Sequence, residues 1–164
     1  MTDGLKPAAR RIQDLLNERG FSNTVIELPD STRSAAEAAN AVGCKVEAIV
    51  KSLVFRARTT NRPVLVVASG ANRVDEAKLA LVVGQPIGKA DAQFVRERTG
   101  FAIGGVAPIG HAEPPITIID ADLMKLERLY AAAGTPNALF ALTPDELKRM
   151  TEGQIADVRL EPKQ

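Results

Sequence analysis

Short helical and strand patterns alternate along this chain, and the alternation is the feature that most constrains its fold. Ile12, Leu15 and Leu16 recur at helical spacing before Gly20 stops the first helix. Further helices are expected over 34–43, 75–83, 91–99 and 144–150, and strands over 24–28, 53–57, 64–68, 116–119, 129–132, 138–142 and 155–158. Helices and strands interspersed in this order predict an α/β (α+β) fold built on a mixed β-sheet.

The length and composition favour one compact domain over residues 1–164. A chain of this length with 45% apolar residues can bury a single core, and the scarcity of aromatics leaves that core to Ala, Val, Leu and Ile. No run reaches the roughly 18 apolar residues of a membrane span, and no signal peptide follows Met1. The single cysteine, Cys44, cannot form an intrachain disulfide, which agrees with a cytoplasmic location. We expect it to pack at a helix end.

Charge and ligand content exclude other classes of function. The net charge of +1 gives no broad basic surface, so DNA is not an expected partner. One cysteine and one histidine cannot build a His/Cys zinc cluster, and we expect neither a metal nor another cofactor. The paired carboxylates Asp120/Asp122 and Asp145/Glu146 are expected at helix starts, where the helix dipole accounts for them.

One loop concentrates unusual residue types. Three glycines, a proline and the only histidine fall between Gly104 and His111. Glycine permits positive φ and close approach of a ligand, and proline fixes the backbone, so such a loop suits a small polar or anionic group. Taken alone, however, the loop is better explained as a tight connection before the strand over 116–119, because glycine and proline mark turns more often than sites.

A lysine opens an apolar strand pattern at Lys51, followed by Ser52 to Phe55. Its aliphatic stem is expected to lie against the core, with the ammonium either in a cleft or at the open surface.

Together these two features resemble the YbaK/ProX family of aminoacyl-tRNA deacylases, which is related to the editing domain inserted in many bacterial prolyl-tRNA synthetases. The family pattern places a lysine before a Thr/Ser-Leu strand and a Gly-Gly-x-Ser/Ala-Pro-x-Gly loop about fifty residues later. Lys51 and the loop from Gly104 to Gly110 match it, and the segments Asp120–Leu123 and Leu142–Leu147 match further. The resemblance implies a strongly curved, barrel-like sheet surrounded by helices.

The resemblance also implies a function and a site. The activity would be trans-editing, the hydrolysis of the ester of a mischarged tRNA such as tRNA-Pro carrying Ala, Cys or 2-aminobutyrate. The partners would be that aminoacyl-tRNA and a prolyl-tRNA synthetase. The implied catalytic residues are Lys51 and Gly104, and the implied substrate-binding residues are Ser34, Gly105, Val106, Ala107, Pro108, His111, Ala132 and Gly134.

Several alternatives stay open at this point. Ala107 stands where the family loop often has Ser, and Ala132 stands where some relatives carry a polar residue, so alanine is as plausible a substrate as cysteine. His111 either stacks on the terminal adenine or caps a turn. Arg56, Arg58, Arg62 and Arg73 form a solvated rim or contact the RNA backbone. The rival functions are a non-catalytic tRNA- or synthetase-binding module, and a ligand sensor or amide hydrolase on the same scaffold.

Overall fold

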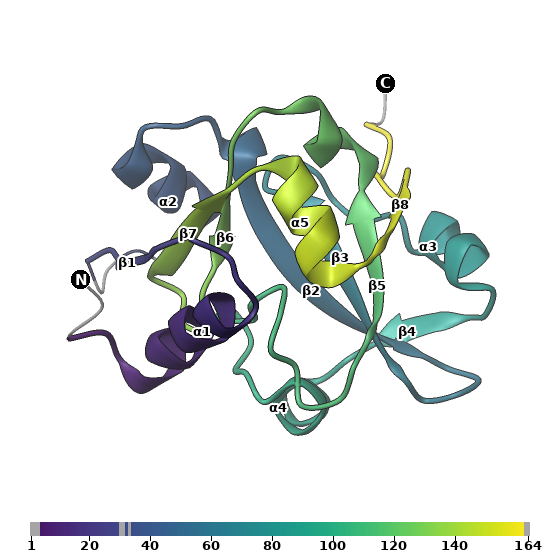
Figure 1. Ribbon diagram of the computed structural model, residues 1–164. Coiled ribbons are helices and arrows are strands. Elements are labelled where there is room, and N and C mark those ends of the chain that lie inside the picture. The colour runs from purple at the N-terminus through teal and green to yellow at the C-terminus, as the bar shows by residue number, and fades with distance from the viewer. Residues whose placement is uncertain (1–3, 30–31, 33, 163–164) are drawn as a thin grey trace.

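A long antiparallel strand pair organises the structure. The computed structural model describes residues 4–29, 32 and 34–162, and its elements are labelled in Figure 1. Strand β2 (Ile49–Ala57) pairs antiparallel with β3 (Pro63–Ser69) in a register that runs from Val50 opposite Ser69 to Arg56 opposite Pro63. Every residue of β3 is buried, so β3 is the centre of the sheet.

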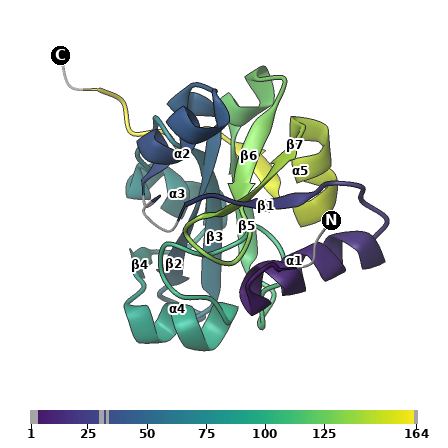
Figure 2. The same cartoon turned by 90° about the vertical axis from the view of Figure 1, so that its left-hand side faces the viewer.

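The remaining strands extend this pair on both sides. The order is β1 (Val25–Glu27), β7 (Ala138–Leu142), β6 (Leu129–Ala132), β2, β3, β5 (Ile116–Asp120) and β8 (Gln154–Ala156), while β4 (Ile87–Lys89) pairs with β2 outside this path. The pairs β6–β2, β3–β5 and β5–β8 are parallel and the others are antiparallel. The mixed sheet is confirmed, and Figures 1 and 2 show it strongly twisted with helices around it.

Capping residues set the helix boundaries. The helices are α1 (Pro7–Glu18), α2 (Ala35–Val42), α3 (Glu76–Val83), α4 (Ala92–Thr99) and α5 (Pro144–Thr151), with short 3₁₀ turns η1 (Val46–Ala48) and η2 (Ala121–Lys125). Side-chain oxygens of Ser34, Asp75, Asp91 and Thr143 accept first-turn N–H groups, which otherwise lack partners. Left-handed glycines end α2, α3 and α4.

Alternation along β3 divides the core between two faces of the sheet. Leu65 and Val67 point to the larger cluster, which includes Ile12 and Leu16 of α1 and Phe140 of β7. Val64, Val66 and Ala68 point to the opposite face. There they pack with Leu79 of α3. Both faces are covered, which explains why β3 reads as a continuous apolar run.

Most expected elements lie within two residues of their predicted bounds, but two strands differ. Strand β2 begins at Ile49, four residues before the prediction, so Lys51 lies inside the strand and not at its start. Strand β4 was not predicted because its three residues are too few to show alternation. Among the described residues, no helix is both long and apolar enough to cross a lipid bilayer.

Candidate active site

A cleft of about 410 Å³ opens along one edge of β2. Strand β3 occupies the other edge, so β6 and β4 must share this one. β6 pairs with Ile49 and Val50, and β4 pairs with residues from Phe55 to Ala57. In the described part of the chain, no strand covers the stretch between them, and the cleft lies there. Its walls come from β2, α2, α4, the loop at Ile103–Val106, and Ala132, Pro136 and Leu139.

Lys51 is the one charged side chain among the described residues that line this cleft. Its Nζ donates a hydrogen bond to the backbone oxygen of Asn72 at 2.8 Å. Burial lowers the pKa of the Lys51 ammonium, nearby Arg73 lowers it further, and Asp120 opposes both effects. The ammonium is therefore partly desolvated and held by a neutral acceptor, which leaves its charge available to a substrate.

A polar network fixes the acceptor of Lys51 from behind. The side-chain amide of Asn72 donates to Asp120 at 2.8 Å and to Asp122 at 2.9 Å. Asp120 is 2% exposed and also accepts from the Ser69 N–H at 3.1 Å. The hydrogen bond from Asn72, followed by that from Lys125, lowers the pKa of Asp122, so Asp122 is a carboxylate at neutral pH. Asp120 also caps η2, as expected for a helix start, but the network gives the pair a second role.

The glycine loop forms another part of the cleft wall, and it uses glycine in two different ways. Gly104 has φ +91°, and a Cβ there would make only an ordinary van der Waals contact, with Pro136 Cγ at 3.9 Å. Gly105 packs flat against Gly134, whose oxygen would lie 2.9 Å from an added Cβ. The Gly105 N–H donates to Ala102 inside the loop. Among the described residues, the N–H groups of Gly104, Val106, Ala107, Ile109, Gly110 and His111 have no acceptor. Of these residues, Gly104 and Val106 line the cleft.

The structure brings together five of the ten residues that the sequence assigned to the site. Lys51, Ser34, Gly104, Val106 and Ala132 line the cleft. The hydroxyl of Ser34 is also engaged in capping α2, where it accepts from the Glu37 N–H at 3.1 Å.

The other five lie behind the cleft wall or beyond it. Gly105, Ala107 and Pro108 are buried. Gly134 has φ +95° and faces the Ala8 oxygen at a distance that leaves no room for a Cβ. These four residues support the loop from behind.

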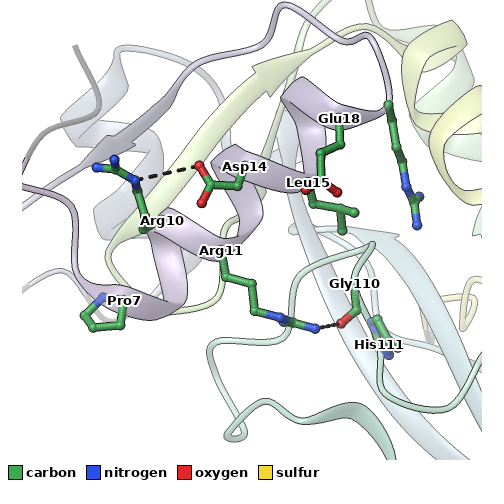
Figure 3. Close-up of a pocket in the computed structure, with 9 residues that line it drawn as sticks. Pro7, Arg10, Arg11, Asp14, Leu15, Glu18, Gly110 and His111 are labelled. Atoms are coloured by element: carbon green, nitrogen blue, oxygen red, sulfur yellow. Dashed lines mark hydrogen bonds and ion pairs between the residues drawn. The ribbon is translucent and has the colours of Figure 1, made fainter.

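His111 lies in a second cavity, between α1 and the far end of the loop (Figure 3). Its Nε2 donates to the Ala107 oxygen at 2.7 Å, and its ring meets the edge of Phe101 at 5.4 Å between centroids. Nδ1 is buried without a partner among the described residues. Burial lowers the pKa of His111, the hydrogen bond to Ala107 opposes this effect, and the charge of Arg11 lowers the pKa further. The ring is therefore neutral at neutral pH, and its hydrogen bond to Ala107 stabilises the loop.

Sequence reasoning missed Ser52 and Asn72. The Ser52 hydroxyl is buried in the cleft wall without a partner in the described chain. Ser52 follows Lys51 in the family pattern but is given no role there, and a lone asparagine such as Asn72 carries no spacing signal. None of Arg56, Arg58, Arg62 and Arg73 lines the cleft, and Cys44 packs beside the cluster of Ala38, Ala39, Ile49 and Leu139 as expected.

Comparison with known families agrees with this geometry. Residues 29–150 match the model of the aminoacyl-tRNA editing domain, and the chain belongs to this family.

Three relatives are similar over nearly the whole chain. The uncharacterized protein YwhH of Bacillus subtilis (strain 168) is 32% identical over 133 residues, which cover 81% of this chain and 84% of YwhH. A crystal structure of a "putative trans-editing enzyme for prolyl tRNA synthetase" is 48% identical, with a TM-score of 0.92 over 96% of this chain and 100% of that one. The hypothetical protein APE2540 is 29% identical, with a TM-score of 0.84 over 92% and 99% of the two chains.

The buried His111 predicts a pH dependence of stability. Its pKa is lower in the folded protein than the ordinary value of 6.5, so the unfolded chain binds the extra proton first as the pH falls. This difference in the His111 pKa does not affect the free energy of unfolding above about pH 7.5. It lowers that free energy as the pH falls through 6.5. We expect His111→Gln to lose less stability than the wild type between pH 7.5 and 5 in urea unfolding. Parallel pH profiles of the two proteins would contradict this.

Proposed function

We propose that this protein hydrolyses the ester bond of a mischarged aminoacyl-tRNA, with the aminoacylated end in the β2 cleft. The single strongest support is that one small cleft is lined by Lys51, its one charged residue among those described, and by Gly104 and Val106, whose N–H groups have no acceptor in the described chain. Membership of the aminoacyl-tRNA editing family supports the class of substrate.

The cleft suggests how the chemistry proceeds. Water adds to the ester carbonyl carbon, negative charge develops on the carbonyl oxygen, and the Gly104 and Val106 N–H groups stabilise it. The bond to the ribose oxygen then breaks, that oxygen takes a proton, and free amino acid and tRNA leave. Loss of one such donor typically costs about 100- to 1000-fold in rate.

Lys51 and the substrate would supply the remaining groups. The described residues of the cleft include no His, Asp, Glu or Cys, so no side chain there is an evident general base. A ribose hydroxyl of the terminal nucleotide, or a backbone carbonyl, would orient the attacking water. The Lys51 ammonium would hold the substrate carbonyl or terminal phosphate.

The walls favour a small aliphatic aminoacyl group. Ala35, Ala38, Ala132, Pro136 and Leu139 offer apolar contact. The polar side chains of the described lining are Lys51, Ser52 and Ser34, and the Ser34 hydroxyl caps α2. A synthetase pocket discriminates against an amino acid that lacks one methylene by only about 1–3 kcal/mol. A second site that hydrolyses the smaller mischarged products is therefore needed. We therefore place alanyl and 2-aminobutyryl tRNA-Pro ahead of the cysteinyl ester.

Lys51 provides the first test. We expect Lys51→Ala to lower deacylation of alanyl-tRNA-Pro by about 100-fold or more, since no other cation reaches the cleft among the residues that line it. Lys51→Arg should also lower the deacylation rate, because the broad guanidinium does not replace a compact ammonium. The exposed Lys89 is the matched control, and Lys89→Ala should retain activity. A folded Lys51→Ala protein with wild-type rates would remove Lys51 from the mechanism.

The two walls should respond differently to substitution. Gly104→Ala is strained by its positive φ and should lower the rate with every aminoacyl group. Ala132→Gly widens the cleft and should shift the ratio of 2-aminobutyryl to alanyl deacylation upward, by no more than the roughly 1–3 kcal/mol of one methylene, about 10- to 200-fold. The measurement is that ratio in both variants. Unchanged rates and an unchanged ratio would place the substrate elsewhere.

A further inference from the structure

A second cavity, of about 680 Å³, carries the arginines of helix α1. Arg10, Arg11 and Arg19 line it together with Asp14, Glu18 and the end of the glycine loop at Gly110 and His111. Figure 3 shows the Arg11 side chain reaching from α1 to Gly110. We call this cavity the α1 groove.

Two of its three arginines are held by neutral partners. Arg11 donates to the Gly110 oxygen, and its guanidinium lies 5.3 Å from the centroid of the Phe101 ring. Arg19 donates to the Met150 oxygen at 3.4 Å. Neither makes an ion pair with a carboxylate in the described chain, whereas Arg10 lies 3.7 Å from Asp14. A guanidinium has five donors, so Arg11 and Arg19 are oriented cations with donors left for an outside anion.

The groove and the cleft share one loop. Gly104 and Val106 line the cleft, and Gly110 and His111 line the groove. The six residue steps of backbone from Gly104 to Gly110 span at most about 20 Å. A stacked strand with a spacing of about 3.4 Å covers that length with about six nucleotides. Figure 2 shows α1, α2 and α4 around the same side of the molecule. A polynucleotide with its end in the cleft can therefore pass the groove.

We propose that the α1 groove binds the phosphate backbone of the RNA whose aminoacylated end occupies the β2 cleft, with Arg11 and Arg19 as the phosphate contacts. This inference rests on the proposed function for the identity of the RNA. The three arginines face two carboxylates, one already paired, so the groove suits one or two phosphates and not a broad polyanion surface. The net charge of +1 agrees with such a local contact.

The test uses the full chain and tRNA-Pro without an amino acid, so that binding is measured apart from hydrolysis. We expect Arg11→Gln and Arg19→Gln each to weaken binding by up to about fivefold, the upper range for an exposed ion pair. Each should also reduce the slope of log affinity against log salt by about 0.7 to 0.9. Arg11→Lys should keep most of the slope, because it keeps the charge.

The exposed Arg128 supplies the control, since it lines neither cavity. Arg128→Gln removes the same charge and should leave the affinity and the slope unchanged. Wild-type affinity and slope in both groove variants would overturn the inference, and so would an equal loss in Arg128→Gln. Normal RNA binding with lost binding to purified prolyl-tRNA synthetase would assign the groove to a protein partner and overturn it as well. The groove variants could reduce the salt slope while the wild-type protein does not deacylate aminoacyl-tRNA. That result would support RNA binding by the α1 groove and refute only the proposed function.

Discussion

The unequal pairing of β2 determines where this protein can bind anything. One edge of the strand is covered by β3 nearly throughout, while the other is shared by β6 at one end and β4 at the other. The stretch between them includes Lys51 and Ser52 and borders a cleft instead of a strand. An open strand edge in a sheet is usually blocked, because its backbone groups invite pairing. Here α2, α4 and the glycine loop enclose it.

Two buried arrangements hold the groups around this gap. On one side, Asp120 and Asp122 hold Asn72, whose backbone oxygen accepts from Lys51. On the other, Gly105 packs against Gly134, and Gly134 packs against Ala8 of α1, at distances that exclude a side chain. Backbone contacts as close as these fix the position of the free loop donors without placing a side chain in the cleft. The loop thus depends on α1, although α1 does not line the cleft.

Much of the fold was predictable because its signals are local. Asp75 and Asp91 cap their helices, and Gly43, Gly84 and Gly100 end theirs, within one residue of the expected positions. The site was predictable in part, since the spacing of Lys51 and Gly104 carries the family pattern. The placement of His111 and Gly134, and the contribution of Asn72, depend on contacts between segments far apart in the sequence. No periodicity or motif reports such contacts, so only the structure could separate cleft residues from their supports.

The proposed function requires the aminoacylated end of the substrate to occupy the gap along β2. A non-hydrolysable aminoacyl adenosine, with an amide in place of the ester, tests it directly in an amide chemical-shift titration of the isotope-labelled protein. We expect saturable shifts at Lys51, Ser52, Gly104 and Val106, with the amides of α3 on the opposite face unchanged. Saturable shifts confined to other residues, with those four amides unmoved, would contradict it.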